Sequence, residues 1–277
     1  IYPPQRFALL CSWLIGIGSA GNLIAASPLA YATSLIGWRG AMVGMAVITA
    51  LVAILLAFII RNPPRVTTAR AVGLIEGLRT IFSLRALWPL LPISTISYAV
   101  LIAERGLWAG PYLTDVFGLA PVERGTILLI MAASMSAGAL IYGPLDRVFG
   151  GYKWISVIGT AITAAGFLGL ALFEPSLTRS AVLLSVLGAA GMTYGVLMAH
   201  GRAFVPDHLL GRGITFLNIL FIGGAAIIQP ISGAVMKQLL EGPPQFAYAV
   251  LHGGFAILLL MSLAIYLVSK DVRRDHL

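Results

Sequence analysis

Residues 40–60 read GAMVGMAVITALVAILLAFII, a stretch without a single charged side chain. A helix needs about 20 apolar residues, at about 1.5 Å per residue, to cross roughly 30 Å of bilayer hydrocarbon. Because no water is present there, every backbone N–H and C=O group must be bonded within the segment, and a helix meets this condition. We therefore predict that residues 40–60 form a transmembrane helix.

Other charge-free stretches of similar length occur along the whole chain, and none alternates apolar and polar residues as the strands of a membrane barrel do. We therefore predict an all-α membrane protein with eight transmembrane helices: Phe7–Trp38, Gly40–Ile60, Ala86–Ala103, Gly125–Leu145, Trp154–Phe173, Ser180–Gly201, Gly213–Met236 and Gly242–Ser269.

The overall composition supports lipid as the main solvent of this 277-residue chain. Hydrophobic residues make up 59% and charged residues 10%, against about 25% charged in soluble domains, and the mean hydropathy is +0.95. These values exclude a soluble enzyme. The net charge of +8 could indicate nucleic acid, but the basic residues lie between the apolar stretches, so we expect lipid and not nucleic acid as partner.

Cofactors and enzymatic chemistry find no support in the sequence. Cys11 is the single cysteine, and the four histidines are dispersed, so we expect no metal site and no cofactor. His252 precedes Gly253, but the nucleophile motif of an intramembrane protease is missing, and we assign it no role. Without a nucleophile–base–acid set, we expect no enzyme.

Lysine and arginine in the gaps predict the orientation, since such residues are enriched on the cytoplasmic side. With residues 1–6 inside, thirteen basic residues are cytoplasmic and four are external, and Arg105 lies within a span. Both chain ends are therefore predicted to be cytoplasmic, in a multi-pass protein of the bacterial inner membrane. The external residues are Arg39, Arg124, Arg179 and Lys237.

Residues 62–86 form the longest gap, and they divide two spans from six. Pro63 and Pro64 end the preceding helix. From Val72 to Phe82 the apolar residues recur at helical spacing, so we predict a short amphipathic helix on the inner membrane surface. A solvated linker is the alternative. The predicted domains are a partial amino-terminal bundle (1–61), a cytoplasmic linker (62–86) and a six-helix bundle (87–277).

This arrangement resembles the major facilitator superfamily, in which a basic cytoplasmic linker joins two six-helix bundles. Residues 21–39, GNLIAASPLAYATSLIGWR, resemble the family's fifth helix and its outer Gly-Trp-Arg turn. Residues 143–153, GPLDRVFGGYK, resemble the signature loop between helices eight and nine. The resemblance implies that the chain holds family helices five to twelve, eight of an expected twelve. A natural eight-helix protein is the alternative.

The resemblance to the family's signature loop implies that this loop acts as a gate. Its matching residues are Gly143, Asp146, Arg147, Gly150 and Lys153. The family role implies that Asp146 meets the positive amino end of a neighbouring helix and latches one face of the protein closed. A solvated turn with topogenic charges is the alternative.

Glu104 and Arg105 interrupt an apolar stretch that runs from Leu87 to Phe117. Charged residues within a membrane usually face the protein interior or water. Glu104 is therefore a candidate for proton coupling, and Arg105 suits an anionic solute or a carboxylate. Since Arg85 and Glu104 are about 28 Å apart along a helix, the alternative is a pair of interfacial anchors.

Polar side chains within the spans form a second group of candidates for contact with a solute: Tyr98, Tyr194, Asn218 and Gln229. Hydrogen bonding between helices is their alternative role. Taken together, the sequence predicts a secondary transporter that moves a small polar or anionic solute by alternating access, with protons as the candidate coupling ion. A membrane receptor or sensor on the same scaffold is the alternative.

Overall fold

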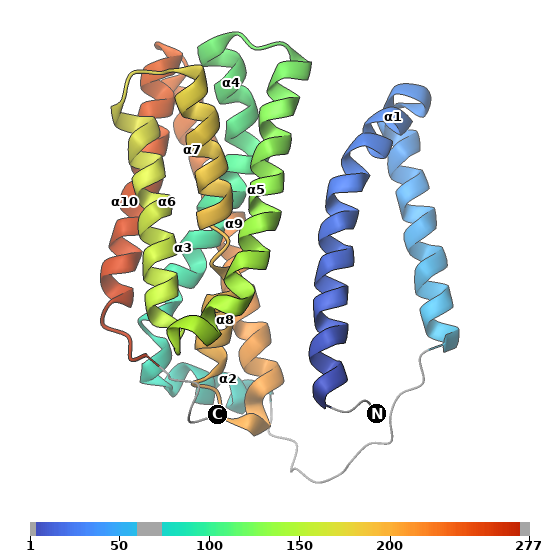
Figure 1. Cartoon of the computed structure of the whole chain (residues 1–277), viewed down its shortest axis with the longest axis vertical. Helices are drawn as coiled ribbons and strands as arrows, with labels where there is room; N and C mark the ends of the chain where they lie inside the picture. Colours follow the sequence, from blue (N-terminus) through green and yellow to red (C-terminus); the bar gives the residue numbers. More distant parts are fainter. Residues whose placement is uncertain (1–3, 60–73, 272–277) are drawn as a thin grey trace. The chain divides into compact units, whose positions relative to one another are not determined.

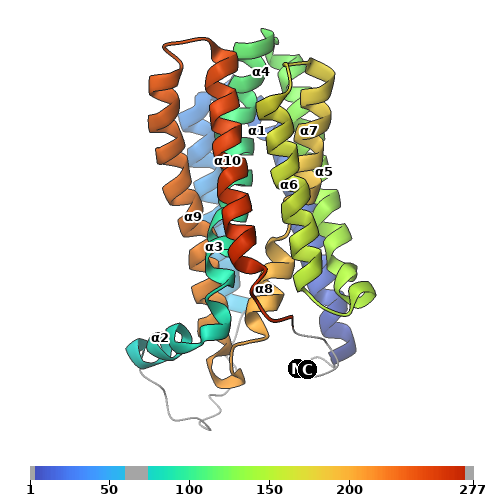
Figure 2. The ribbon, with the colours of Figure 1, turned by 90° about the vertical axis from the view of Figure 1, so that its left-hand side faces the viewer.

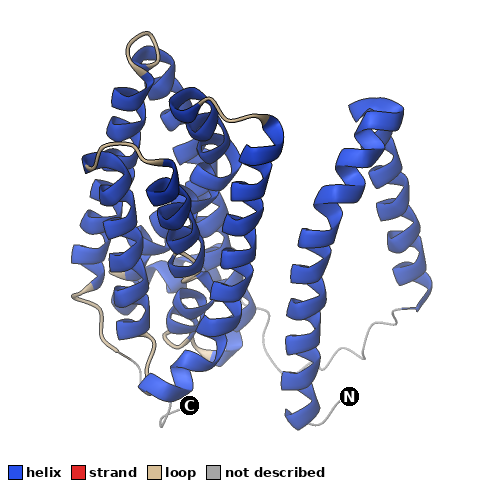
Figure 3. Cartoon of the chain, turned by 45° about the horizontal axis from the view of Figure 1, so that its top comes forward, coloured by secondary structure: helices blue, strands red, loops and turns tan. Residues whose placement is uncertain are grey.

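A computed structural model describes the backbone of residues 4–59 and 74–271. Within these ranges it describes all side chains except those at positions 4–30, 34, 74–78, 144, 146–148 and 207. The elements of the described part are helices (Figure 3), which confirms the predicted all-α architecture. The chain divides into two compact units, Ile1–Arg70 and Ala71–Leu277, and their boundary falls within the predicted linker.

The first unit contains one element, α1 (Pro4–Ile59), which bends sharply at Gly37. Gly37 has φ of 71° and ψ of 167°, a conformation that is essentially restricted to glycine. The Arg39 guanidinium lies 4.3 Å from the centre of the Trp38 ring. This bend separates two helical arms at the position of the Gly-Trp-Arg turn expected from the sequence.

The second unit begins with a short helix, α2 (Leu74–Ser83), which lies in the predicted linker. Its Ile81 is buried against Leu87, Leu209 and Phe216, so one face of α2 packs on the following bundle. The burial of Ile81 therefore argues against the alternative of a fully solvated linker. Its position on a membrane surface remains a prediction.

The bundle itself follows α2, with its helices running up and down between two ends (Figures 1 and 2). Its elements are η1 (Arg85–Leu87), α3 (Leu90–Ala103), η2 (Glu104–Trp108), α4 (Ala109–Phe117), α5 (Pro121–Phe149), α6 (Lys153–Leu172), α7 (Leu177–Ala190), α8 (Tyr194–Arg202), η3 (Asp207–Leu209), α9 (Leu210–Leu239) and α10 (Pro244–Tyr266).

Seven segments of the described part are long and apolar enough to cross a membrane: Leu35–Ile59, Arg85–Phe117, Pro121–Gly143, Lys153–Leu172, Leu177–Arg202, Leu210–Leu239 and Pro244–Tyr266. The remaining predicted span, Phe7–Trp38, falls mostly on residues whose side chains lie outside the described positions, and its backbone is helical within α1.

The structure corrects the predicted end of one span. Ala86–Ala103 was expected to stop before the charged pair, but the helix continues to Phe117 through the π-helical turn η2. A π turn inserts one extra residue into a helix and is frequent at functional sites. Glu104 therefore begins an irregular turn within a long helix and does not follow the end of a helix.

Glycines bring the helices of the bundle close together. A Cβ atom at Gly138 of α5 would overlap the backbone oxygen of Ala189 in α7, and one at Gly224 of α9 would overlap that of Thr95 in α3. Small residues allow such approach in membranes, where dispersion forces between packed helices replace the hydrophobic effect. The α5–α7 and α3–α9 contacts therefore depend on these two glycines.

We predict that Gly138→Ala destabilises the bundle by about 1–3 kcal/mol, because the new methyl group would force α5 and α7 apart. The measurement is thermal unfolding of the purified protein in detergent. Gly125→Ala is the matched control in the same helix, since a Cβ there meets no atom within 4 Å. The control should be neutral or stabilising by up to ~1 kcal/mol, and equal melting temperatures for both variants would contradict the packing argument.

Candidate functional site

A buried carboxyl–imidazole pair lies inside the bundle. Glu104, the first residue of η2, is fully buried, and so is His252 of α10. The Nε2 atom of His252 lies 3.3 Å from Oε2 and 3.4 Å from Oε1 of Glu104. Full burial does not fit the interfacial-anchor interpretation of Glu104, because an anchor would reach the headgroup region.

Aromatic side chains surround this pair. The rings of Tyr112, Phe167 and Tyr248 have their centres 5.1, 6.0 and 6.2 Å from that of the His252 ring. The Tyr112 hydroxyl is hydrogen bonded to Ser180 at 2.8 Å, and the Tyr248 hydroxyl donates to Asp115 at 2.7 Å. Both phenols therefore have hydrogen-bond partners of their own, outside the pair.

Arg105 follows Glu104 directly in the sequence. It is half-buried, and among the described residues it has no hydrogen-bond or ion-pair partner. Glu104 and Arg105, although neighbours on the helix, therefore form no ion pair with each other. A guanidinium group is suited to carboxylates and other anions.

Three of the predicted polar residues lie together, although they come from three helices. The Tyr194 hydroxyl at the start of α8 donates a hydrogen bond of 3.0 Å to Oδ1 of Asn218 in α9. The ring of Tyr98 in α3 lies 5.4 Å from that of Tyr194, and Phe221 packs 4.6 Å from the same ring. We call Tyr98, Tyr194 and Asn218 the tyrosine–asparagine cluster; all three are half-buried.

Gln229 does not join this cluster. It stands eleven positions after Asn218 in α9, about 16 Å along the helix axis. Its backbone oxygen accepts a hydrogen bond from Ser232, whose hydroxyl in turn accepts one from the Trp108 indole. The structure thus separates Gln229 from the other polar candidates.

The cluster lies beside a break between α7 and α8. Helix α7 ends at Ala190, and α8 starts at Tyr194, whereas the sequence indicated a continuous span over Ser180–Gly201. The hydroxyl of Tyr142 donates a 2.7 Å hydrogen bond to the carbonyl oxygen of Ala190, the last residue of α7. Breaks of this kind are tolerated in membranes when neighbouring side chains satisfy the backbone, and they often mark binding sites.

The predicted gating loop is shorter than expected, because α5 continues through Phe149. Gly143, Asp146 and Arg147 therefore belong to the last turns of a helix. The side chains of Asp146 and Arg147 lie outside the described positions, so their proposed contact with a neighbouring helix remains a prediction.

Lys153, the remaining candidate of the gate, connects helices of the same bundle. Its Nζ atom donates hydrogen bonds of 2.7 Å to the carbonyl oxygens of Leu267 and Ser269, just after α10. In return, Oδ1 of Asp271 accepts from the backbone N–H groups of Tyr152 and Lys153, at 3.2 and 3.1 Å. Each charge thus neutralises the dipole of the opposite helix end.

His200 of α8 extends this contact. It is fully buried, and its Nε2 atom lies 2.9 Å from the carbonyl oxygen of Lys270. Because a carbonyl can only accept, Nε2 carries the proton, and Nδ1 accepts from the Tyr266 hydroxyl at 2.7 Å. The chain after α10 is therefore held by α6 and α8, at the end of the bundle where α2 lies (Figure 2).

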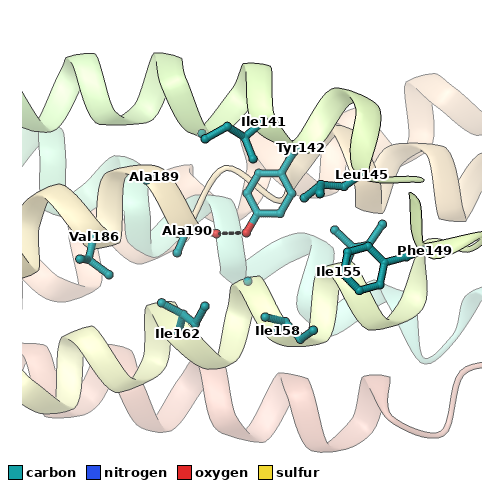
Figure 4. Close-up of a pocket in the computed structure, with 12 residues that line it drawn as sticks. Ile141, Tyr142, Leu145, Phe149, Ile155, Ile158, Ile162, Val186, Ala189 and Ala190 are labelled. Carbon is teal, nitrogen blue, oxygen red and sulfur yellow. Dashed lines mark hydrogen bonds between the residues drawn. The ribbon is translucent and has the colours of Figure 1, made fainter. Parts of the chain in front are cut away.

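A hollow of about 320 Å³ lies between α5, α6 and α7 (Figure 4). Its walls are isoleucine, leucine, valine, alanine, glycine and one phenylalanine, and Tyr142 is the single polar side chain among them. The Tyr142 hydroxyl already donates to Ala190, and Ile141 on the rim is 58% exposed. This hollow offers a polar solute no free donor and does not suit the predicted substrate.

Six of the seven long apolar segments belong to the second unit, which is the architecture of an integral, multi-pass membrane protein. Residues 6–209 match the family described as MFS/sugar transport protein. The chain therefore belongs to the major facilitator superfamily, as its sequence indicated. Among curated proteins no match is found.

The structure is similar to the crystal structure of a bacterial homolog of the human lysosomal transporter Spinster, in an inward-facing and unoccupied conformation. The TM-score is 0.60 and the sequence identity 21%, so the likeness establishes a common fold alone. The match covers 91% of this chain and 64% of the other.

Sequence reasoning missed His252 and the contacts at the end of α10. An ionisable residue within an apolar span is by itself a signal, and His252 carries that signal. Its partner could not be recognised, because 148 positions separate the two residues in the sequence.

We predict that Lys153→Met loosens the chain after α10, since methionine keeps most of the apolar stem but loses both hydrogen bonds to carbonyl oxygens. Hydrogen exchange of residues 267–271 should become faster, and stability should fall by about 1–3 kcal/mol, the range for hydrogen bonds to a charged group. Lys237→Met is the control, because Lys237 is exposed at the end of α9. Unchanged exchange in Lys153→Met would show that these bonds do not hold the segment.

Proposed function

We propose that the complete protein is a secondary active transporter that moves a small polar or anionic solute by alternating access and couples the movement to protons. The tyrosine–asparagine cluster is the observation that carries this proposal. It combines phenol and amide groups from three helices beside a broken helix, within a membrane bundle. Membership in a family described by sugar transport supports the class of activity.

The cluster supports a solute site by its unused hydrogen-bonding capacity. Tyr98 is half-buried and has no hydrogen-bond partner among the described residues. The Asn218 amide uses its Oδ1 atom toward Tyr194, which leaves its NH₂ group as a donor. Phenol faces and amide groups suit the hydroxyl groups and apolar faces of a sugar, and Arg105 would favour an anionic solute.

Proton coupling is supported by the burial of Glu104. A buried carboxylate without water or a counterion is costly, so a carboxyl group inside a membrane bundle is suited to exchange a proton only when the bundle opens to water. Tyr98 and Glu104 lie on one continuous helix, six residues and about 9 Å apart. Solute binding near Tyr98 can therefore influence the access of water to Glu104.

The same proposal includes the orientation of the chain and the membrane in which it lies. The excess of lysine and arginine in alternate gaps supports cytoplasmic chain ends in a bacterial inner membrane. In that orientation α2 and the Lys153 contacts face the cytoplasm, and the ends of α4 and α9 face outward. Gate closure by residues 143–153 is part of this scheme.

A receptor or sensor on this scaffold is the second candidate function. It would bind a solute at the same cluster and would pass the signal to a partner without net flux. Binding of the solute would then raise the melting temperature of the protein, while vesicles that contain the protein would take up no solute.

We predict that proteoliposomes containing the full-length protein accumulate a small sugar or organic anion when a proton gradient is imposed. Tyr194→Phe should raise KM by about three- to tenfold, the equivalent of one lost hydrogen bond, with little change in folding. Thr126→Val is the control, since it removes an exposed hydroxyl of α5 that lies outside the cluster. Solute-dependent thermal stabilisation without uptake would favour the receptor instead.

We also predict that Glu104→Gln abolishes accumulation driven by the proton gradient while it preserves exchange of labelled for unlabelled solute. Glutamine keeps the shape of the side chain but cannot release a proton. Uptake of labelled solute with and without a collapsed gradient measures the difference. Gradient-driven accumulation in Glu104→Gln equal to that of the wild type would remove Glu104 from the coupling mechanism.

A further inference from the structure

Among the described residues, Glu104 and His252 form an ion pair only with each other. Oε2 of Glu104 and Nδ1 of His252 have no hydrogen-bond partner among the described residues. Tyr112 from α4 and Tyr248 from α10 are the titratable side chains that face the imidazole. Each is bonded elsewhere, to Ser180 and to Asp115, and the phenyl ring of Phe167 on α6 packs beside the imidazole.

This isolation limits the charge that the pair can hold. A net charge without a counterion is very unfavourable in apolar surroundings. The pair is neutral as a carboxylic acid beside an uncharged imidazole, and it is also neutral as a carboxylate beside an imidazolium. Both forms hold the same number of protons, and they differ by the position of one.

We propose that the imidazole of His252 and the carboxyl group of Glu104 together hold the transported proton. In the transfer, the O–H bond of Glu104 breaks and an N–H bond forms at Nε2 of His252, whose Nδ1 atom keeps its own hydrogen. The atoms lie 3.3–3.4 Å apart, a long hydrogen bond that a small helix movement would shorten. This inference rests on the proposed transport function and adds His252 to it.

The sharing of the proton has a consequence for transport. Glu104 belongs to the α3–η2–α4 helix and His252 to α10, so a movement between these two helices separates the proton's two sites. When water reaches the opened pair, one proton leaves and a net negative charge remains beside Arg105. The pair then attracts a new proton before the bundle can close.

Infrared spectroscopy of the purified full-length protein tests this inference without any solute. The C=O stretching band of a protonated carboxyl group should titrate with pH, and Glu104→Gln should remove it. His252→Gln should displace the midpoint of that band by about one pH unit or more, because the carboxyl group loses its ionisable partner. An unmoved midpoint would overturn the shared proton. His208→Gln, at an exposed histidine, is the matched control and should leave the midpoint unchanged.

Transport measurements separate this inference from the proposed function. If the two residues act as one unit, then Glu104→Gln, His252→Gln and the double variant should lose gradient-driven accumulation to the same extent. Full coupling in His252→Gln together with loss in Glu104→Gln would refute the shared proton but keep the transporter. If His252→Gln does not fold, His252→Asn takes its place. Absence of flux in the wild type would refute the transporter. The infrared measurement would then still show whether Glu104 and His252 share a proton.

Discussion

A bilayer offers a polypeptide no hydrogen-bonding partner, and this constraint determines most of the structure. Each N–H and C=O group within the hydrocarbon must be bonded inside the protein, so the apolar stretches become helices. Where a helix is interrupted, another group has to complete the bonding. At the break between α7 and α8, the Tyr142 hydroxyl donates such a hydrogen bond to the carbonyl oxygen of Ala190.

The same constraint decides where polar side chains can lie. Helices in lipid do not gain from hiding apolar surface from one another, so they associate through close packing and through hydrogen bonds between them. Gly138 and Gly224 permit the close packing, and Tyr194 with Asn218 supplies a hydrogen bond. The polar groups inside the bundle therefore hold helices together, and the same groups could also bind a solute.

The fold could be predicted largely from local sequence because length and hydrophobicity define a membrane helix without knowledge of its neighbours. The helix α10, for example, lies within the predicted stretch Gly242–Ser269. The irregular features could not be predicted in this way. At the π turn Glu104 contacts His252 of α10, and at the interruption after Ala190 the carbonyl oxygen is bonded by Tyr142 of α5. Both contacts join residues that are distant in the sequence.

The candidate site shows the same division between local and distant information. Glu104 was recognisable because a charge within an apolar run requires an explanation, and Tyr98, Tyr194 and Asn218 because they are polar within spans. His252 gives a weaker signal, since an uncharged histidine is tolerated in many environments. The contact between α3 and α10 belongs to the tertiary structure, and the sequence of neither segment alone predicts it.

The positions of these groups on the helices connect the two ends of the bundle. Helix α10 contains His252, and the chain that follows it is held by Lys153 and His200 at the end where α2 lies. The helix that contains Glu104 also contributes Tyr98 to the tyrosine–asparagine cluster. Because packed helices tend to shift as units, we expect a movement that changes the distance between Glu104 and His252 to affect Tyr98 or the contacts after α10. In the proposed transporter, this geometry would connect the proton site at Glu104 and His252 with the solute site at Tyr98 through two helices.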